Sequence, residues 1–264
     1  HDDINSRWVD WSGREHTSAE PFITESTIYC RDGSIKRIAA QVSAINNKYL
    51  FSCTDVTEKW RSEQRNQTRN RMLERIARGE QLDNIMNELI YDIEAENPLM
   101  RCGILLLDAE GKRLLSCAAP SLPDFYNDAI DGLEIGPGVG SCGTAAYLGE
   151  RVIVEDISTH PYWATFRHLA ARAGLRSCWS QPIIASTHQV LGSFAIYHTQ
   201  PSTPDDADIE QISFAANLAS IAIENINNRE ALIRREKAYR SLAENAPDAI
   251  AFNDPAATEI YTNP

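Results

Sequence analysis

The chain has 264 residues, 43% of them hydrophobic, a length that suits one to three domains with substantial cores. Its 25 basic and 37 acidic residues give a net charge of -12, so it lacks a general source of the basic surface that nucleic-acid binding requires. The longest apolar runs, near 104–107 and 190–197, are far shorter than the roughly 20 residues that span a bilayer. Because the N-terminus also lacks the basic and apolar regions of a signal peptide, we expect a cytoplasmic protein with no membrane span and no nucleic-acid partner.

The six cysteines are scattered along the chain, without a Cys-x-x-Cys pair or a histidine at zinc-finger spacing. We therefore expect no metal site. Four of the cysteines lie in apolar, strand-like runs, where a free cysteine behaves as a small buried hydrophobic residue. Cys142 is the exception, because it lies in a glycine-rich segment.

The N-terminal part of the chain is predicted to form strands joined by tight turns. Two runs rich in β-branched residues, 22–30 and 35–45, flank an Asp-Gly turn signal, and a third strand follows at 49–53. Asp55 or Thr57 can then cap the helix that comes next.

The same residues resemble a known family. The run RDGSIKR, then a hydrophobic strand, then DVTEKW is similar to the second half of a PAS domain, where an Asp-Ile/Val-Thr-Glu ending leads into a signalling helix. The resemblance implies that residues 1–58 are the C-terminal part of a PAS domain.

A connector helix is predicted over residues 59–78, which are charged and polar with few apolar anchors. Apolar residues then recur at helical spacing from Leu82 to Ile93 and predict the first core-facing helix of a new domain. Pro98 is predicted to end that helix.

The middle of the chain alternates strands with short helices. A helix from Ser141, its predicted cap, to Leu148 follows the glycine-rich segment, and a second helix is expected over 162–173. Five strands are predicted at 101–107, 113–119, 151–155, 177–185 and 190–198.

A long helix is predicted from Asp205 to about Glu244, with acidic residues in the first turn, where the helix macrodipole favours them. Apolar residues recur at steps of three and four as far as Ile226. Such a helix is roughly 60 Å long and extends beyond the core of one domain. Residues 227–240 are therefore a second connector, which must be solvated or pair with another helix.

The glycine-rich segment lacks the Gly-Lys-Ser/Thr ending of a phosphate-binding loop and does not fit the Rossmann fingerprint. The run GPGVGSCGTAAYLGERVIVEDI, followed by HPYW, RSCWSQPI and VLGSFAIYH, instead resembles GAF domains, most of all those between PAS domains and cyclic-di-GMP enzymes. The resemblance implies an α+β fold over residues 79–226, with a mainly antiparallel sheet flanked by helices. The connector helices would join it to the preceding PAS half.

A GAF ligand pocket lies between one face of the sheet and the helices and loops laid over it, and this pattern suggests six pocket residues. They are Cys142, Thr144, Trp163, Phe166, Trp179 and Tyr197. The aromatic residues can equally fill the core, which for Trp179 and Tyr197 is at least as strong an interpretation. Trp163 is the best functional candidate, because it follows His160-Pro161-Tyr162 in a connecting segment.

The sequence lacks the signatures of cyclic-nucleotide and bilin binding: Cys178, for example, is followed by Trp179 where bilin-binding domains have a histidine. A lone histidine is more often a surface or hydrogen-bonded residue than a haem ligand. We therefore expect no cofactor, and a small colourless ligand or none.

Free methionine-R-sulfoxide reductases are GAF enzymes with a similar Gly-Val-Cys-Gly-Thr-Ala turn, and Cys142 falls near their cysteine. The second cysteine that this chemistry needs, expected in residues 165–173, is missing. We therefore expect no catalytic residue.

Near the C-terminus, the run YRSLAENAPDAIAFND resembles the opening helix and first strand of a PAS domain, and residues 261–264 match the Asn-Pro after its second strand. Residues 241–264 are thus predicted to start a second PAS domain.

Three functional classes follow: a sensory relay, a GAF enzyme using Cys142, and a ligand-free dimerisation scaffold. The resemblance favours the relay, coupled to a diguanylate cyclase or phosphodiesterase output, although these residues contain no GGDEF, EAL or histidine-kinase signature. The expected partners are a second copy, in a parallel homodimer through the connector helices, and the covalently linked output domain.

Overall fold

The computed structural model describes residues 8–9, 15–16, 22–30, 35–45, 48–97 and 99–244. The chain divides into two compact units, His1–Arg69 and Asn70–Pro264, each taken by itself below. Some predicted features lie outside the described residues: the turns at 31–34 and 46–47, the helix stop at Pro98, and residues 245–264 of the predicted second PAS segment.

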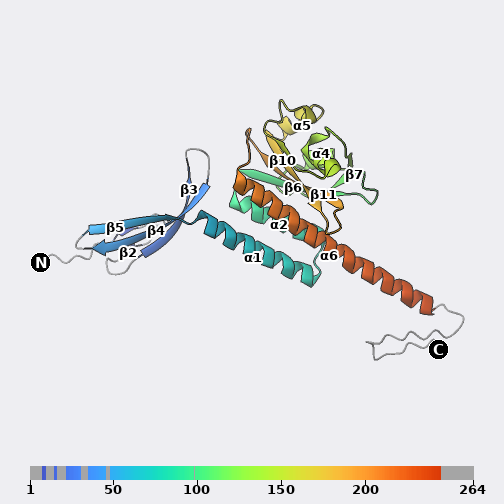
Figure 1. Cartoon of the computed structure of the whole chain (residues 1–264), viewed down its shortest axis with the longest axis horizontal. Coiled ribbons are helices and arrows are strands. Elements are labelled where there is room, and N and C mark those ends of the chain that lie inside the picture. The colour runs from blue at the N-terminus through green and yellow to red at the C-terminus, as the bar shows by residue number, and fades with distance from the viewer. Residues whose placement is uncertain are drawn as a thin grey trace. The chain divides into compact units, whose positions relative to one another are not determined.

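The first unit contains a three-stranded antiparallel sheet in the order β3-β4-β5, followed by the start of helix α1 (Figure 1). The three predicted strands are confirmed, and the last is longer than expected because its pairing with β4 continues to Asp55. The elements are β1 (Trp8–Val9), β2 (Glu15–His16), β3 (Phe22–Tyr29), β4 (Ile35–Ile45), β5 (Lys48–Asp55) and α1 (Thr57–Arg78).

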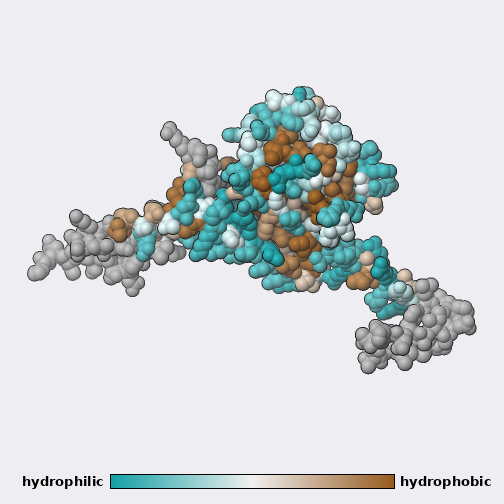
Figure 2. All heavy atoms as spheres, viewed as in Figure 1, coloured by the Kyte–Doolittle hydropathy of each residue, from teal (hydrophilic) through white to brown (hydrophobic). Residues whose placement is uncertain are grey.

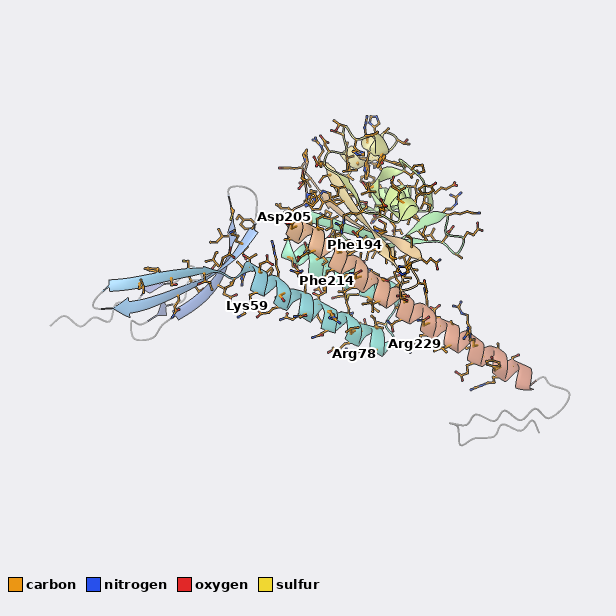
Figure 3. All side chains as sticks on the ribbon, viewed as in Figure 1. Lys59, Arg78, Phe194, Asp205, Phe214 and Arg229 are labelled. Carbon is orange, nitrogen blue, oxygen red and sulfur yellow. The ribbon has the colours of Figure 1, made fainter. Side chains whose placement is uncertain are left out.

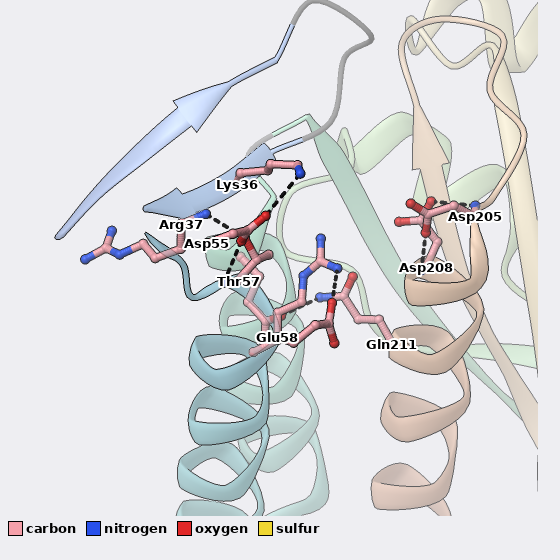
Figure 4. A network of polar contacts seen from close by, with 10 residues as sticks. Lys36, Arg37, Asp55, Thr57, Glu58, Asp205, Asp208 and Gln211 are labelled. Atoms are coloured by element: carbon pink, nitrogen blue, oxygen red, sulfur yellow. Dashed lines mark hydrogen bonds and ion pairs between the residues drawn. The ribbon is translucent and has the colours of Figure 1, made fainter. Parts of the chain in front are cut away.

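Hydrogen bonds fasten the start of α1 to the sheet (Figure 4). The Asp55 carboxylate accepts from both the backbone N–H (3.0 Å) and the hydroxyl of Thr57, which satisfies a donor at the helix start. The Thr57 hydroxyl oxygen accepts from the backbone N–H of Arg37 (2.9 Å), and Lys36 donates to Asp55 (3.0 Å). The bonds that the Asp55 carboxylate accepts, first of all that from the Thr57 hydroxyl, lower its pKa to about 2.

The second unit is built on a six-stranded antiparallel sheet in the order β8-β7-β6-β11-β10-β9. Its strands are β6 (Met100–Leu107), β7 (Arg113–Ala118), β8 (Leu133–Glu134), β9 (Val152–Val154), β10 (Ser177–Ile184) and β11 (Val190–His198). The five predicted strands are confirmed. The sixth, β8, was not predicted, because two residues are too short to show an alternating pattern.

The helices of this unit are α2 (Leu82–Glu96), α3 (Asp124–Ile130), α4 (Gly140–Leu148), the short 3₁₀ helix η1 (Pro161–Trp163), α5 (Arg167–Arg172) and α6 (Asp206–Glu244). The single helix predicted over residues 162–173 is wrong, since η1 and α5 divide that stretch.

Each face of the sheet has its own core. Along β11, Phe194 and Ile196 pack with α2 and α6, whereas Ala195 and Tyr197 pack with α3, α4 and η1. This alternation is the period of two that a strand imposes on its side chains. Figure 1 shows α2 and α6 on one side of the sheet and α4 and α5 on the other.

Helix α6 is 39 residues long, as predicted. Asp205 and Asp208 accept hydrogen bonds from each other's backbone N–H groups, which closes a reciprocal cap at its start (Figure 4). Its first half buries residues such as Ala215 and Ala222, whereas the side chains of residues 227–241 are exposed except for the half-buried Ala231. Figure 2 shows mostly hydrophilic side chains over this second half, with scattered hydrophobic ones.

Helix α1 ends against α6 within this second unit. Gly79 follows α1 with a φ of +70°, and its N–H donates to the carbonyl oxygen of Ile76. The Arg229 guanidinium lies directly over Gly79, so that a side chain at position 79 would overlap it. Figure 3 shows Arg229 on α6 beside Arg78 at the end of α1.

Candidate functional site

Thr144 organises the glycine-rich segment before α4. Its hydroxyl donates to the carbonyl oxygen of Gly140 (2.6 Å) and accepts from the N–H of Gly138 (3.1 Å). Gly138 and Gly140 have φ values of +82° and +57°, which only glycine adopts without strain. Thr144, one of the predicted pocket residues, therefore stabilises the loop, and its hydroxyl is hydrogen-bonded within that loop.

Ser141 does not cap α4, which corrects the expectation from the sequence. The helix begins at Gly140, and Val139 precedes it without a side-chain cap. The Ser141 hydroxyl instead accepts a hydrogen bond from Nε1 of Trp163 (2.9 Å) and donates to the carbonyl oxygen of Cys178 (3.4 Å). Ser141 thus ties α4 to η1 and to β10.

Under α4, six buried side chains with hydroxyl or thiol groups meet on one face of the sheet; we call them the hydroxyl–thiol cluster. None is more than 7% exposed, and none carries a formal charge in its ordinary ionisation state. The cluster consists of Tyr126, Cys142, Cys178, Ser180, Ser193 and Tyr197.

Cys142 lies at the centre of this cluster. Its sulfur is 3.3 Å from the hydroxyl oxygen of Ser180 and 3.5 Å from that of Tyr197. The Cys178 sulfur is 3.5 Å from the same Ser180 oxygen, and Tyr126 donates to the Tyr197 oxygen over 3.5 Å. One hydroxyl group therefore contacts both sulfur atoms.

The cluster also holds an unsatisfied polar atom. Ser193 is fully buried, and its hydroxyl has no hydrogen-bond partner among the described residues. Ser193 lies on the same face of β11 as Ala195 and Tyr197, which pack under α4. A buried hydroxyl without a partner costs free energy, which a bound water or ligand group would offset.

Hydrogen bonding sets the ionisation of the two cysteines apart. The Cys178 thiol, followed by Ser180 and Tyr197, donates toward Cys142 and lowers the pKa of Cys142 to about 7 against the opposing effect of burial. Burial raises the pKa of Cys178, and the neighbouring Cys142 raises it further. Cys142 is therefore the thiol of the pair that ionises first, and its place in the first turn of α4 adds to this difference.

The predicted pocket residues do not all come together. Cys142 and Tyr197 lie in the cluster, Trp163 is buried at its edge against Gly140, and Phe166 packs on the same core partly buried. Trp179 lies in the core on the opposite face, where its Nε1 donates to the carbonyl oxygen of Ser202 (3.1 Å). Trp179 therefore does not contact the cluster, because it alternates along β10 with Cys178 and Ser180, and its assignment to a ligand pocket stays a prediction.

Four members of the cluster were not predicted: Tyr126, Cys178, Ser180 and Ser193. The alternation of side chains along β10 indicates two of them, because Cys178 and Ser180 flank Trp179 and so lie together on the face opposite Trp179. Tyr126 comes from α3, a segment whose sequence gave no register relative to the sheet.

In the part of the chain that the structure describes, no three His, Cys, Asp or Glu side chains gather closely enough to hold a metal ion. The helices among those residues also fall short of the length and apolar character needed to cross a bilayer.

The chain is similar to a curated protein of Methanosarcina acetivorans, the methyl sulfide methyltransferase-associated sensor, at 32% identity over 260 residues. The match covers 96% of this chain and 26% of that protein, so the chain spans about a quarter of its relative.

Solved structures share the fold of the second unit. Residues 122 to 287 of a methyl-accepting chemotaxis protein superpose with a TM-score of 0.51 at 21% identity, over 62% of this chain and 99% of that one. A free methionine-R-sulfoxide reductase from Neisseria meningitidis superposes with a TM-score of 0.50 at 18% identity, over 64% of this chain and 90% of that one. The family model described as "GAF domain" matches residues 80–224, and the chain therefore belongs to the GAF domain family.

Proposed function

We propose that this chain is the sensory and relay part of a longer signalling protein. A small ligand, or a chemical change, at the hydroxyl–thiol cluster would alter the GAF domain, and helix α6 would carry that change to an output domain. The name of the Methanosarcina acetivorans relative, a sensor, agrees with this role. The half PAS domain predicted over residues 1–58 and the PAS start predicted at 241–264 would be neighbouring modules of the same relay.

The observation that carries the proposal is the division of α6 into two halves. The first half is part of the core beneath the sheet, where Ile212, Ala219 and Ile223 are buried. The second half continues the same helix without interruption, and from residue 227 to residue 241 its side chains are exposed apart from the half-buried Ala231. A rigid element with one end in a domain core can transmit a displacement of that core over its whole length.

The cluster supports a sensing role because it combines buried hydroxyl groups, a hydroxyl without a partner at Ser193, and a thiol of lowered pKa at Cys142. Perturbed groups in a polar buried site are typical of functional positions. The six side chains favour a small uncharged or singly charged ligand without a chromophore. The purified protein is accordingly expected to show no absorption band in the visible range.

A parallel homodimer is part of this proposal. On the exposed side of α6, the apolar residues Ile221, Leu232 and Tyr239 fall on one series of alternating four- and three-residue steps, which is the spacing of a coiled-coil seam. This α6 seam consists of Ile221, Asn225, Asn228, Leu232, Arg235 and Tyr239, all exposed. Asparagine at a seam position is a feature that specifies register in parallel two-stranded coiled coils.

The output domain is proposed from the sequence resemblance alone, as a diguanylate cyclase or phosphodiesterase acting on cyclic-di-GMP. The chain itself is proposed to be non-catalytic. The second candidate function, reduction of free methionine-R-sulfoxide through Cys142, is tested by incubating the purified chain with that substrate and a thiol reductant. We expect no turnover.

The relay is tested by insertions in α6 of the full-length protein, placed after Glu236 so that the contact of Arg229 with Gly79 stays intact. Two inserted residues turn the following helix by about 200°, whereas four turn it by about 400°, a net rotation near 40°. The output rate, measured as cyclic-di-GMP synthesis and hydrolysis, should change far more with two residues than with four. Equal and negligible effects of both insertions would show that α6 is only a tether.

A further inference from the structure

Two cysteines of the hydroxyl–thiol cluster lie side by side on different elements. Cys142 is on α4 and Cys178 is on β10, and their sulfur atoms are 3.3 Å and 3.5 Å from the same Ser180 hydroxyl oxygen. Their side chains are free thiols. Sulfur atoms that share one contact atom can meet through side-chain rotation, provided that the Cβ atoms lie within the range that a disulfide spans.

The two sulfurs also differ in the way that a reactive pair requires. Cys142 is in the first turn of a nine-residue helix, where the helix macrodipole favours a thiolate, and hydroxyl groups of Ser180 and Tyr197 contact its sulfur. Cys178 is fully buried in the sheet and stays protonated. One thiol can therefore act as a nucleophile while the other keeps the proton that a leaving hydroxide needs.

From this geometry we infer that Cys142 and Cys178 form an oxidisable pair, in which a hydroperoxide converts the two thiols into a disulfide that links α4 to β10. The inference rests on the proposed sensory role, because it names the chemical signal that the cluster would register. It does not depend on the helix relay, and its test below does not use the output domain.

The reaction takes place in two steps. The Cys142 thiolate attacks one oxygen of hydrogen peroxide, the O–O bond breaks, and a sulfenic acid forms at Cys142 as hydroxide leaves. The Cys178 sulfur then attacks the Cys142 sulfur, the S–O bond breaks, and the hydroxyl leaves as water with the Cys178 proton. The proton that Cys142 gave up on ionising converts the hydroxide to water, so two thiols and one peroxide yield one disulfide and two waters.

The other two cysteines of the second unit provide the contrast. Cys117 is half-buried beside Asp83, and desolvation, followed by the Asp83 charge, raises its pKa to about 12. Burial and then Glu94 likewise raise the pKa of Cys102. Both thiols should stay reduced under conditions that oxidise Cys142.

The test uses the whole chain with Cys30→Ser and Cys53→Ser, which removes the cysteines of the first unit. After brief exposure to equimolar hydrogen peroxide, the protein is unfolded, its free thiols are alkylated, and its peptides are mapped by mass spectrometry without reduction. We expect a linked peptide pair containing Cys142 and Cys178, lighter by two hydrogen atoms, with the thiols of Cys102 and Cys117 alkylated. Dithiothreitol should restore the two thiols.

Two variants separate the roles. In Cys178→Ser, a sulfenic acid should persist at Cys142 and be trapped by dimedone, whereas in Cys142→Ser, Cys178 should stay reduced. Cys117→Ser is the matched control and should form the same link as the parent. Recovery of both cysteines as free thiols in the parent, a link to a different cysteine, or unchanged oxidation of Cys178 in Cys142→Ser would each overturn the inference. The peptide map of the parent protein keeps every residue of the hydroxyl–thiol cluster. The test therefore stays decisive even if one of the variants misfolds.

Discussion

The indole N–H of Trp163 donates a hydrogen bond of 2.9 Å to the hydroxyl oxygen of Ser141, and both residues are buried. The sequence predicts Trp163 to be a loop residue over a binding site, and its contact with a ligand stays a prediction. The structure adds a second role, in which Trp163 holds the first turn of α4 against η1. The start of α4 therefore depends on a residue about twenty positions further along the chain.

This hydrogen bond gives a first prediction. Ser141→Ala should lower the free energy of unfolding by about 1–3 kcal/mol, because it leaves the buried Trp163 N–H without an acceptor. The same change in a Trp163→Phe background should cost less, since no indole donor remains. Urea denaturation of the four proteins measures the difference. Ser158→Ala, at an exposed position, is the control and should change stability by no more than about 0.5 kcal/mol.

The contact between Gly79 and Arg229 gives a second prediction. Gly79→Ala should destabilise the protein more than Gly111→Ala, although both glycines have nearly the same positive φ, +70° and +68°. A methyl group at 111 meets no atom within 4 Å, whereas one at 79 overlaps the Arg229 guanidinium. We expect about 1 kcal/mol for the backbone effect at each site and up to about 0.5 kcal/mol more at position 79, because the overlapping atoms are the flexible end of the exposed Arg229 side chain.

Thermal or urea unfolding measures this comparison, and Arg229→Ala supplies its control. Adding Arg229→Ala to Gly79→Ala should recover the additional loss and leave only the backbone effect. If the two glycine variants are equally stable, then the guanidinium moves aside freely and does not fasten α6 to the end of α1.

His198 gives a prediction on pH. Burial lowers the pKa of His198 from 6.5 to about 4 in the folded protein, where its ring lies beside Trp179 and within 3.4 Å of the Ser177 hydroxyl. The unfolded chain therefore binds a proton at higher pH than the folded chain does. The stability from this group is present above pH 6.5 and is lost as the pH falls toward 4, by about 2 kcal/mol at pH 5.

The comparison is with His198→Gln, which cannot titrate in this range. Urea unfolding between pH 8 and pH 4.5 should show a steeper loss for the wild-type protein than for the variant. Parallel pH curves for the two proteins would mean that His198 takes up its proton in the folded state without cost.

The α6 seam gives a prediction on assembly. Leu232→Asp, at a seam position that is 65% exposed, should convert the proposed dimer to a monomer at tens of micromolar, because it places a charge in the helix–helix interface. Ile233→Asp makes the same kind of change one residue away, at a side chain 43% exposed and off the seam, and should leave the dimer intact. Sedimentation equilibrium distinguishes these outcomes. A wild-type monomer at the same concentration would contradict the proposed assembly.

Much of the fold was predictable because its patterns are local. The long apolar and acidic pattern from Asp205 predicted α6 almost to the residue, and the β-branched runs predicted the strands of both units. Each of these signals lies within one element, where side-chain spacing alone determines whether a helix or a strand can bury its apolar residues. The glycine-rich run carried the family resemblance for a related reason, since Gly138 and Gly140 meet backbone requirements of the turn itself.

What the tertiary structure decided was which side chains meet. The sequence placed Trp179 and Tyr197 together as aromatic residues on neighbouring strands, but the register of β10 with β11 pairs Trp179 with Ile196 and so puts the two on opposite faces. The same register brings Ser180 and Cys178 under α4, where Cys142 meets them. Pairing between strands and the docking of a helix on a sheet depend on contacts between segments distant in the chain. A single sequence does not record which of the alternative pairings buries the most apolar surface.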